Sequence, residues 1–65
     1  MQITINGEIK NLNQPITVAD LLDEMKLKGR IAVELNQEIL PRSKFAKYRV
    51  NNGDVLEIVR AIGGG

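Results

Sequence analysis

Hydrophobic and polar residues alternate at several places along the chain, a pattern typical of strands with one buried face. Near the amino terminus, Ile3 and Ile5 alternate with Gln2 and Thr4. Asn6-Gly7 follows, and both positions of this dipeptide accept the positive φ that a type I′ turn needs. We therefore expect a β-hairpin over residues 1–12.

The next segment has the spacing of an amphipathic helix. Its apolar residues recur at i, i+3, i+4 and i+7 and so share one face: Val18, Leu21, Leu22 and Met25. Thr17 is the expected N-cap, with Asp20 three residues later. Gly29 is the expected C-cap, and Lys26 and Lys28 should lie in the last turn, where they complement the helix dipole. These limits predict a helix of about nine to eleven residues.

Alternation returns in the second half of the chain. Ile31, Val33 and Leu35 predict a third strand, and residues 38–40 a brief fourth strand that Pro41 ends. Residues 42–48 predict a loop with one helical turn.

A turn at Asn52-Gly53-Asp54 then leads into a last strand over residues 55–60. Leu56 and Ile58 should face inward on this strand, while Val55, Glu57 and Val59 face outward. The order is ββαβββ. One helix can cover only one face of a sheet, so the pattern predicts an α+β domain whose other sheet face meets solvent.

Composition narrows the possible chemistry. The 65 residues contain neither Cys nor His and carry a formal net charge of +1. Disulfides, thiolate nucleophiles, imidazole bases and the usual zinc ligands are therefore excluded. No apolar run has the length of a membrane span or a signal-peptide core, so we expect no membrane association and a cytoplasmic protein.

Three glycines, Gly63-Gly64-Gly65, follow the last strand. Glycines bury no side chain and lose much backbone entropy when ordered, so they add little to a folded domain. They do provide a terminal carboxylate on a thin arm that could enter a narrow tunnel of another protein. Five residues beyond Arg60 would reach about 16 Å when extended.

Several short motifs together resemble the ThiS family, whose fold is the ubiquitin-like β-grasp. They are Glu34-Leu35-Asn36, Ile39-Leu40-Pro41-Arg42, Asn52-Gly53-Asp54 and the closing run from Glu57 to Gly65. The resemblance implies a mixed four- to five-stranded sheet with one helix packed on one face. The first and last strands would pair in parallel at its centre. Residues 1–60 would form the domain and residues 61–65 a flexible tail.

The resemblance also implies a role as a sulfur carrier in thiamin (thiazole) biosynthesis. A ThiF-type adenylyltransferase would use ATP and magnesium to adenylate the Gly65 carboxylate. Sulfur from a cysteine desulfurase would convert it to a thiocarboxylate, which donates sulfur to the thiazole synthase ThiG. The chain would then be a protein co-substrate with no catalytic residue, metal or stably bound cofactor of its own.

In this scheme two groups of residues meet the partners. The tail that threads into the adenylating enzyme comprises Ala61, Ile62, Gly63 and Gly64, with Gly65 as the modified residue. The candidates for docking the folded domain are Glu57, Val59 and Arg60 at the end of the last strand.

Other functions remain open at this stage. A MoaD-like small subunit of molybdopterin synthase would share the tail chemistry. A ubiquitin-like modifier would instead join its terminal glycine to Lys amines, and in a pure interaction module the tail would do nothing.

The remaining basic, acidic and hydroxyl side chains are better explained by structural roles than by a binding or catalytic site. A basic run with two aromatic residues could suggest RNA binding: Arg42, Lys44, Phe45, Lys47, Tyr48 and Arg49. With a near-neutral total charge it is better interpreted as a solvated loop whose aromatics pack on the core. Asp20, Asp23 and Glu24 complement the helix dipole without any metal. Thr17 and Ser43 lack a base partner and are interpreted as capping or loop hydroxyls.

Overall fold

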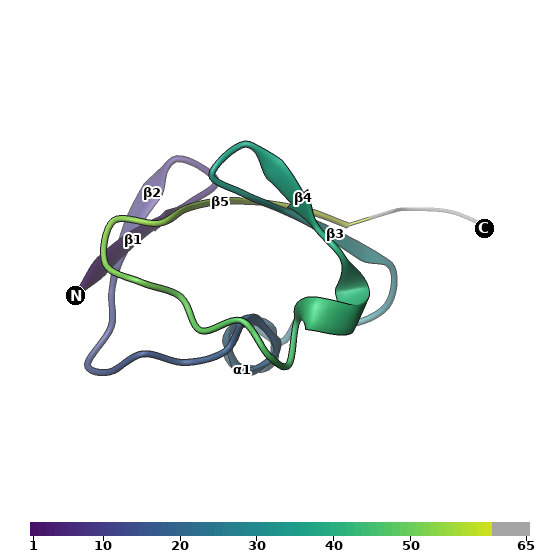
Figure 1. Cartoon of the computed structure of the whole chain (residues 1–65), viewed down its shortest axis with the longest axis horizontal. Coiled ribbons are helices and arrows are strands. Elements are labelled where there is room, and N and C mark those ends of the chain that lie inside the picture. Colours follow the sequence, from purple (N-terminus) through teal and green to yellow (C-terminus); the bar gives the residue numbers. More distant parts are fainter. Residues whose placement is uncertain (61–65) are drawn as a thin grey trace.

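The computed structural model describes residues 1–60, and its elements follow the predicted order (Figure 1). They are β1 (Gln2–Ile5), β2 (Glu8–Asn11), α1 (Val18–Glu24), β3 (Ile31–Leu35), β4 (Glu38–Leu40), the short 3₁₀-helix η1 (Arg42–Lys44) and β5 (Val55–Arg60). No helix within residues 1–60 is long and apolar enough to cross a membrane.

The strands form one mixed five-stranded sheet in the order β2-β1-β5-β3-β4. β1 and β5 are parallel, whereas β1–β2, β3–β4 and β3–β5 are antiparallel. The expectation that the first and last strands pair in parallel at the centre is confirmed. β5, the last strand in sequence, is therefore the middle strand of the sheet.

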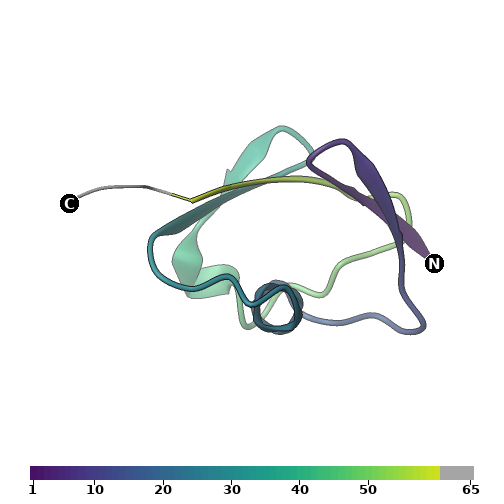
Figure 2. The same ribbon diagram turned by 180° about the vertical axis from the view of Figure 1, so that it is seen from behind.

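The helix and the sheet enclose an aliphatic core. Two opposite views show α1 beneath one face of the curved sheet, while no element of residues 1–60 covers the other face (Figures 1 and 2). On β5 the burial alternates as predicted, with Leu56 and Ile58 inside and Val55, Glu57 and Val59 outside. The buried hydrophobic residues are Ile3, Ile5, Leu12, Val18, Leu21, Leu22, Ile31, Val33, Leu40, Val50, Leu56 and Ile58.

The predicted hairpin is confirmed, and its turn uses the expected residues. Asn6 has φ 49° and Gly7 φ 85°, the two positive values that match the turn to the twist of the flanking strands. β1 and β2 pair from Gln2↔Asn11 to Ile5↔Glu8.

The N-cap of α1 was predicted correctly but its end was not. The Asp20 backbone N–H donates to Thr17 Oγ1 at 3.0 Å. The helix stops after seven residues, with Met25 as C-cap, so the predicted C-cap Gly29 lies outside it. Lys26 takes the left-handed conformation, with φ 59°.

Two backbone hydrogen bonds explain the early stop of the helix. The Lys26 N–H donates to the Asp23 carbonyl and the Leu27 N–H to the Leu22 carbonyl, which is the Schellman pattern. The predicted match of Lys26 and Lys28 to the helix dipole is therefore also wrong, because the last turn contains no basic residue.

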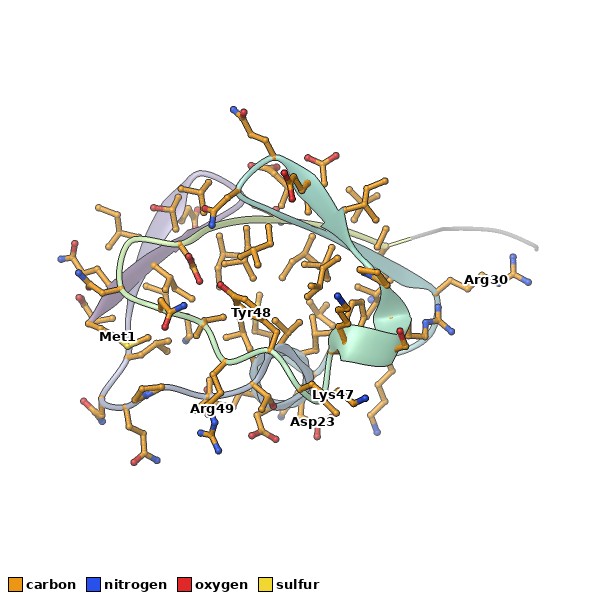
Figure 3. All side chains as sticks on the ribbon, viewed as in Figure 1. Met1, Asp23, Arg30, Lys47, Tyr48 and Arg49 are labelled. Atoms are coloured by element: carbon orange, nitrogen blue, oxygen red, sulfur yellow. The ribbon has the colours of Figure 1, made fainter. Side chains whose placement is uncertain are left out.

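The segment between η1 and β5 crosses back under the sheet and is tied to it by Asp54, a buried carboxylate. Asp54 accepts hydrogen bonds from Asn36 Nδ2, the Tyr48 hydroxyl and the Asn51 N–H at 3.1, 2.9 and 2.8 Å. Figure 3 shows Tyr48 directed from this segment into the space beneath the sheet. These bonds hold the start of β5 against the β3–β4 turn.

Candidate functional site

The candidate site starts from β5, because this strand leads to the glycine-rich end of the sequence. Every residue of β3 pairs with a residue of β5, from Leu35↔Leu56 to Ile31↔Arg60. On the other side, β1 pairs only with the first part of β5, at Val55 and Leu56. The second half of β5 would therefore lack backbone partners on the β1 side.

The Asn6 side chain supplies those partners. Its Oδ1 accepts from the Ile58 N–H at 2.7 Å, and its Nδ2 donates to the Ile58 carbonyl at 3.2 Å. The Asn6 backbone N–H donates to the Leu56 carbonyl at 2.9 Å. A side-chain amide thus continues the ladder where the chain of β1 has turned away, and it holds β5 two residues before Arg60.

The predicted tail lies outside the described residues. This applies to Ala61, Ile62, Gly63, Gly64 and Gly65, and so to the threading segment and the carboxylate that would be modified. The division at residue 60 between domain and flexible tail stays a prediction for the same reason.

The three docking candidates are all exposed, but they do not share one face. Glu57 and Val59 lie on the side of the sheet opposite α1, and Val59 is 63% exposed. Arg60 pairs with the buried Ile31 and so belongs, by strand alternation, to the helix side of the sheet. Only two of the three candidates can therefore contribute to one surface.

The pairing register adds residues to that surface that sequence reasoning missed. Val59 lies opposite Ala32, Glu57 opposite Glu34, and Glu34 in turn opposite Ile39 of β4. Ile39 is 77% exposed. We call the group Ala32, Glu34, Ile39, Val55, Glu57 and Val59 the open face. Alternation in the third strand could have placed Ala32 and Glu34 outward, but only the register sets them beside β5.

The other polar groups take structural positions. Phe45 and Tyr48 are half-buried and pack against the core, in line with the solvated-loop interpretation of the basic run. Thr17 caps the helix as predicted, and Ser43 lies exposed within η1. Within residues 1–60 no group of three or more acidic side chains is placed to hold a metal ion.

A five-stranded mixed sheet that holds one helix on one face, with the last strand at its centre, defines the ubiquitin-like β-grasp class. The chain is similar to a crystal structure of the thiamine biosynthesis protein ThiS from Geobacter metallireducens, with a TM-score of 0.83 and 33% identity. That match covers all of both chains. The predicted fold is thus confirmed.

The model of the ThiS family matches residues 3–65. The sulfur carrier protein ThiS of Escherichia coli is 32% identical over 66 residues, covering 100% of both chains. The chain belongs to the ThiS family. The prediction of a sulfur carrier for thiamin biosynthesis, rather than an enzyme, is confirmed at the level of this family.

One further relative is a much larger protein. A thiazole synthase of Paramagnetospirillum magneticum is 50% identical over 66 residues, which cover 100% of this chain but 20% of that protein. The chain therefore spans about a fifth of this relative and the full length of the E. coli carrier.

Proposed function

We propose that the carboxylate of Gly65 is the group that carries sulfur, and that a ThiF-type adenylating enzyme and a thiazole synthase of the ThiG type are its partners. The observation that carries the proposal is the family match, which extends through the glycines to residue 65. The resemblance of a thiazole synthase to this chain supports the second partner.

The proposed activation solves a simple chemical problem. A carboxylate is a poor acyl donor because its oxygen is a poor leaving group. One Gly65 oxygen attacks the α-phosphorus of ATP, the bond to pyrophosphate breaks, and an acyl-adenylate forms. ATP and Mg²⁺ belong to the adenylating partner, and the carrier itself holds no cofactor stably.

Sulfur then replaces the adenylate. The terminal sulfur of a persulfide, formed by a cysteine desulfurase, attacks the acyl carbon and AMP leaves. A second thiol attacks the cysteine sulfur of this acyl disulfide and forms a new disulfide with it, and the thiocarboxylate is released as the leaving group on Gly65. The sequence contains no Cys, so no thiol of the chain competes for the activated acyl group. Because the first step uses ATP and the second uses reduced thiols, we place the carrier in the cytoplasm.

The folded domain supports this role by holding the strand that leads to the tail. β5 is paired with β3 up to Arg60, and Asn6 holds it at Ile58 on the other side. We propose that Ala61, Ile62, Gly63 and Gly64 thread into the adenylating enzyme, while Glu57 and Val59 contact its surface. Arg60 would be contacted where the strand enters the enzyme.

A reconstitution tests the proposal. The 65-residue chain is mixed with the ThiF-type enzyme of the same organism, ATP, Mg²⁺, a cysteine desulfurase and cysteine, and its intact mass is measured. We expect the mass change of one oxygen-to-sulfur exchange, located on Gly65 by fragmentation. A chain that stays unmodified, or that forms conjugates with Lys residues of other proteins, would refute the carrier mechanism.

A further inference from the structure

Two glutamates lie directly opposite each other at the middle of the open face. Glu34 of β3 and Glu57 of β5 form a cross-strand pair in an antiparallel ladder, and both are exposed. Side chains of such a pair leave the same face of the sheet, with Cβ atoms about 4.5–5.5 Å apart. The register thus brings two carboxylates side by side.

The strand positions that directly flank this pair carry no compensating cation, whereas Arg30 and Arg42 line a pocket with Ala32 and Val59 at the edge of the face. On the same face of their strands, the flanking residues are Ala32 next to Glu34, and Val55 and Val59 next to Glu57. On the other side of β3, the residue of β4 that pairs with Glu34 is Ile39. The pair therefore lies within a mainly apolar frame that faces solvent.

Like charges directly opposite each other destabilise a sheet, so this pair opposes the folding of the chain that contains it. Ionised carboxylates only accept hydrogen bonds, and two of them on neighbouring strands present several acceptor oxygens close together. A guanidinium or ammonium group is the complementary donor, and its charge would remove the repulsion between the glutamates.

We propose that the open face docks the adenylating partner through a basic side chain that inserts between Glu34 and Glu57, while apolar groups of the partner cover Ile39 and Val59. This inference rests on the proposed function. The adenylating partner must recognise the carrier before the tail bears any new group, and a run of glycines offers no side chains to read. Recognition at that step therefore has to come from the folded domain, and this face is continuous with the strand that leads to the tail.

The first test removes the two charges with little change in size. We compare Glu34→Gln/Glu57→Gln with the unchanged chain in binding to the ThiF-type enzyme of the same organism, by calorimetry at two salt concentrations. We expect the Kd to rise by about tenfold or more and its salt dependence to weaken, because an interfacial charge pair is lost. The matched control is Asp23→Asn/Glu24→Gln, which removes the same charge from α1 in the other layer. Its Kd should stay within about twofold.

Thermal unfolding separates this effect from damage to the fold. The Glu34→Gln/Glu57→Gln chain should have a higher Tm than the unchanged chain, since the repulsion is gone. Weaker binding together with higher stability cannot arise from partial unfolding. A lower Tm in this variant would contradict the physical basis of the proposal.

The apolar frame is tested separately. Ile39→Ser should weaken binding to the same enzyme without changing its salt dependence, because it removes apolar contact and no charge. The two kinds of variant should therefore differ in their salt response, although both weaken the complex.

Three outcomes would overturn the inference. They are unchanged binding of the glutamine variant to the ThiF-type enzyme, an equal loss of binding in the helix control, and the lower Tm described above. These outcomes remain distinct from failure of the proposed function, which the mass assay on the unchanged chain reports. If the unchanged chain acquires sulfur while the glutamine variant binds normally, the carrier role stands and the docking model is wrong.

Discussion

At the scale of single residues, Asp54 shows how a turn residue can become a structural centre. The sequence Asn52-Gly53-Asp54 predicts a turn, and the turn is present. The carboxylate is nevertheless buried and accepts three hydrogen bonds, from residues that are 18, 6 and 3 positions away. A buried carboxylate needs such partners because desolvation of an unpaired one is costly. Only the fold brings Asn36 to it.

Tyr48→Phe tests this cluster. The substitution keeps the ring against the core but removes the donor to Asp54 Oδ2, so we expect the free energy of unfolding to fall by about 1–2 kcal/mol. Urea denaturation measures the change. Ser43→Ala, at an exposed position of η1, is the control and should leave stability nearly unchanged. An equally stable Tyr48→Phe chain would show that the hydroxyl contributes nothing to folding.

The same tyrosine predicts a pH dependence. Burial, then the hydrogen bond and the charge of Asp54, raise the pKa of Tyr48, partly offset by the hydrogen bond from Asn51. The unfolded chain then loses the phenolic proton first, near its ordinary pKa of about 10. Stability from this group is therefore complete below about pH 10 and is lost as the pH rises toward the folded-state pKa. Denaturation of the unchanged and Tyr48→Phe chains across this range should show a stability difference that shrinks with pH.

At the scale of elements, the end of α1 shows where local signals compete. Gly29 is the residue that sequence rules favour as C-cap, and it does have a positive φ of 94°. The chain turns earlier, at Lys26, because Leu27 can then return toward the core and both Schellman bonds form. The position of the sheet, which sequence patterns do not contain, decides between the two possible ends.

Lys26→Gly should stabilise the protein. Glycine adopts φ 59° without the steric penalty that a Cβ atom causes, so we expect a gain of about 0.5–1 kcal/mol in the free energy of unfolding. Lys28→Gly is the matched control, since Lys28 has no positive φ; it should be neutral or slightly destabilising. A loss of stability in Lys26→Gly would mean that the Lys26 side chain contributes more than its backbone strain removes.

Asn6 connects two elements that are far apart in sequence. Asn6→Ala removes both side-chain hydrogen bonds to Ile58 and leaves its backbone groups without these partners. We expect the free energy of unfolding to fall by about 1–3 kcal/mol. Hydrogen exchange should also become faster at the Ile58 amide. Asn13→Ala, at an exposed position before α1, serves as control, and equal effects of the two substitutions would argue against the bridging role.

At the scale of the whole molecule, the sheet order gives the last strand a central place. β5 lies between β1 and β3, so the residues that come last in the sequence follow directly from the central strand of the sheet. The open face lies over the same strand. A partner that receives the tail would therefore meet this face at the same time.

One added residue after Gly65 tests whether the position of the carboxylate matters. An extra Ala would move the reactive group by about 3.3 Å, so we expect the adenylating enzyme to release no pyrophosphate with the extended chain. The extended chain should still compete with the unchanged chain for the enzyme, because the domain that docks is intact. Normal pyrophosphate release would show that the enzyme does not depend on the position of this terminus.

The sequence alone determined those features that depend on neighbours along the chain. Alternation sets the strands and their buried faces, Thr17 sets the start of the helix, and Asn6-Gly7 sets the first turn. These are short-range effects of side-chain direction and backbone conformation, which adjacent residues are sufficient to specify. The absence of Cys and His likewise limited the chemistry without any coordinates.

Tertiary structure alone decided which distant residues meet. Three features join positions that are at least 18 residues apart in the sequence. They are the cross-strand pair Glu34 and Glu57, the hydrogen bonds between Asn6 and Ile58, and the hydrogen bond from Asn36 to the buried Asp54. A shift of one residue in strand register would send every side chain of β3 to the other face. That register is set by the packing of the whole core, so the acidic pair on the open face could not be found from local patterns.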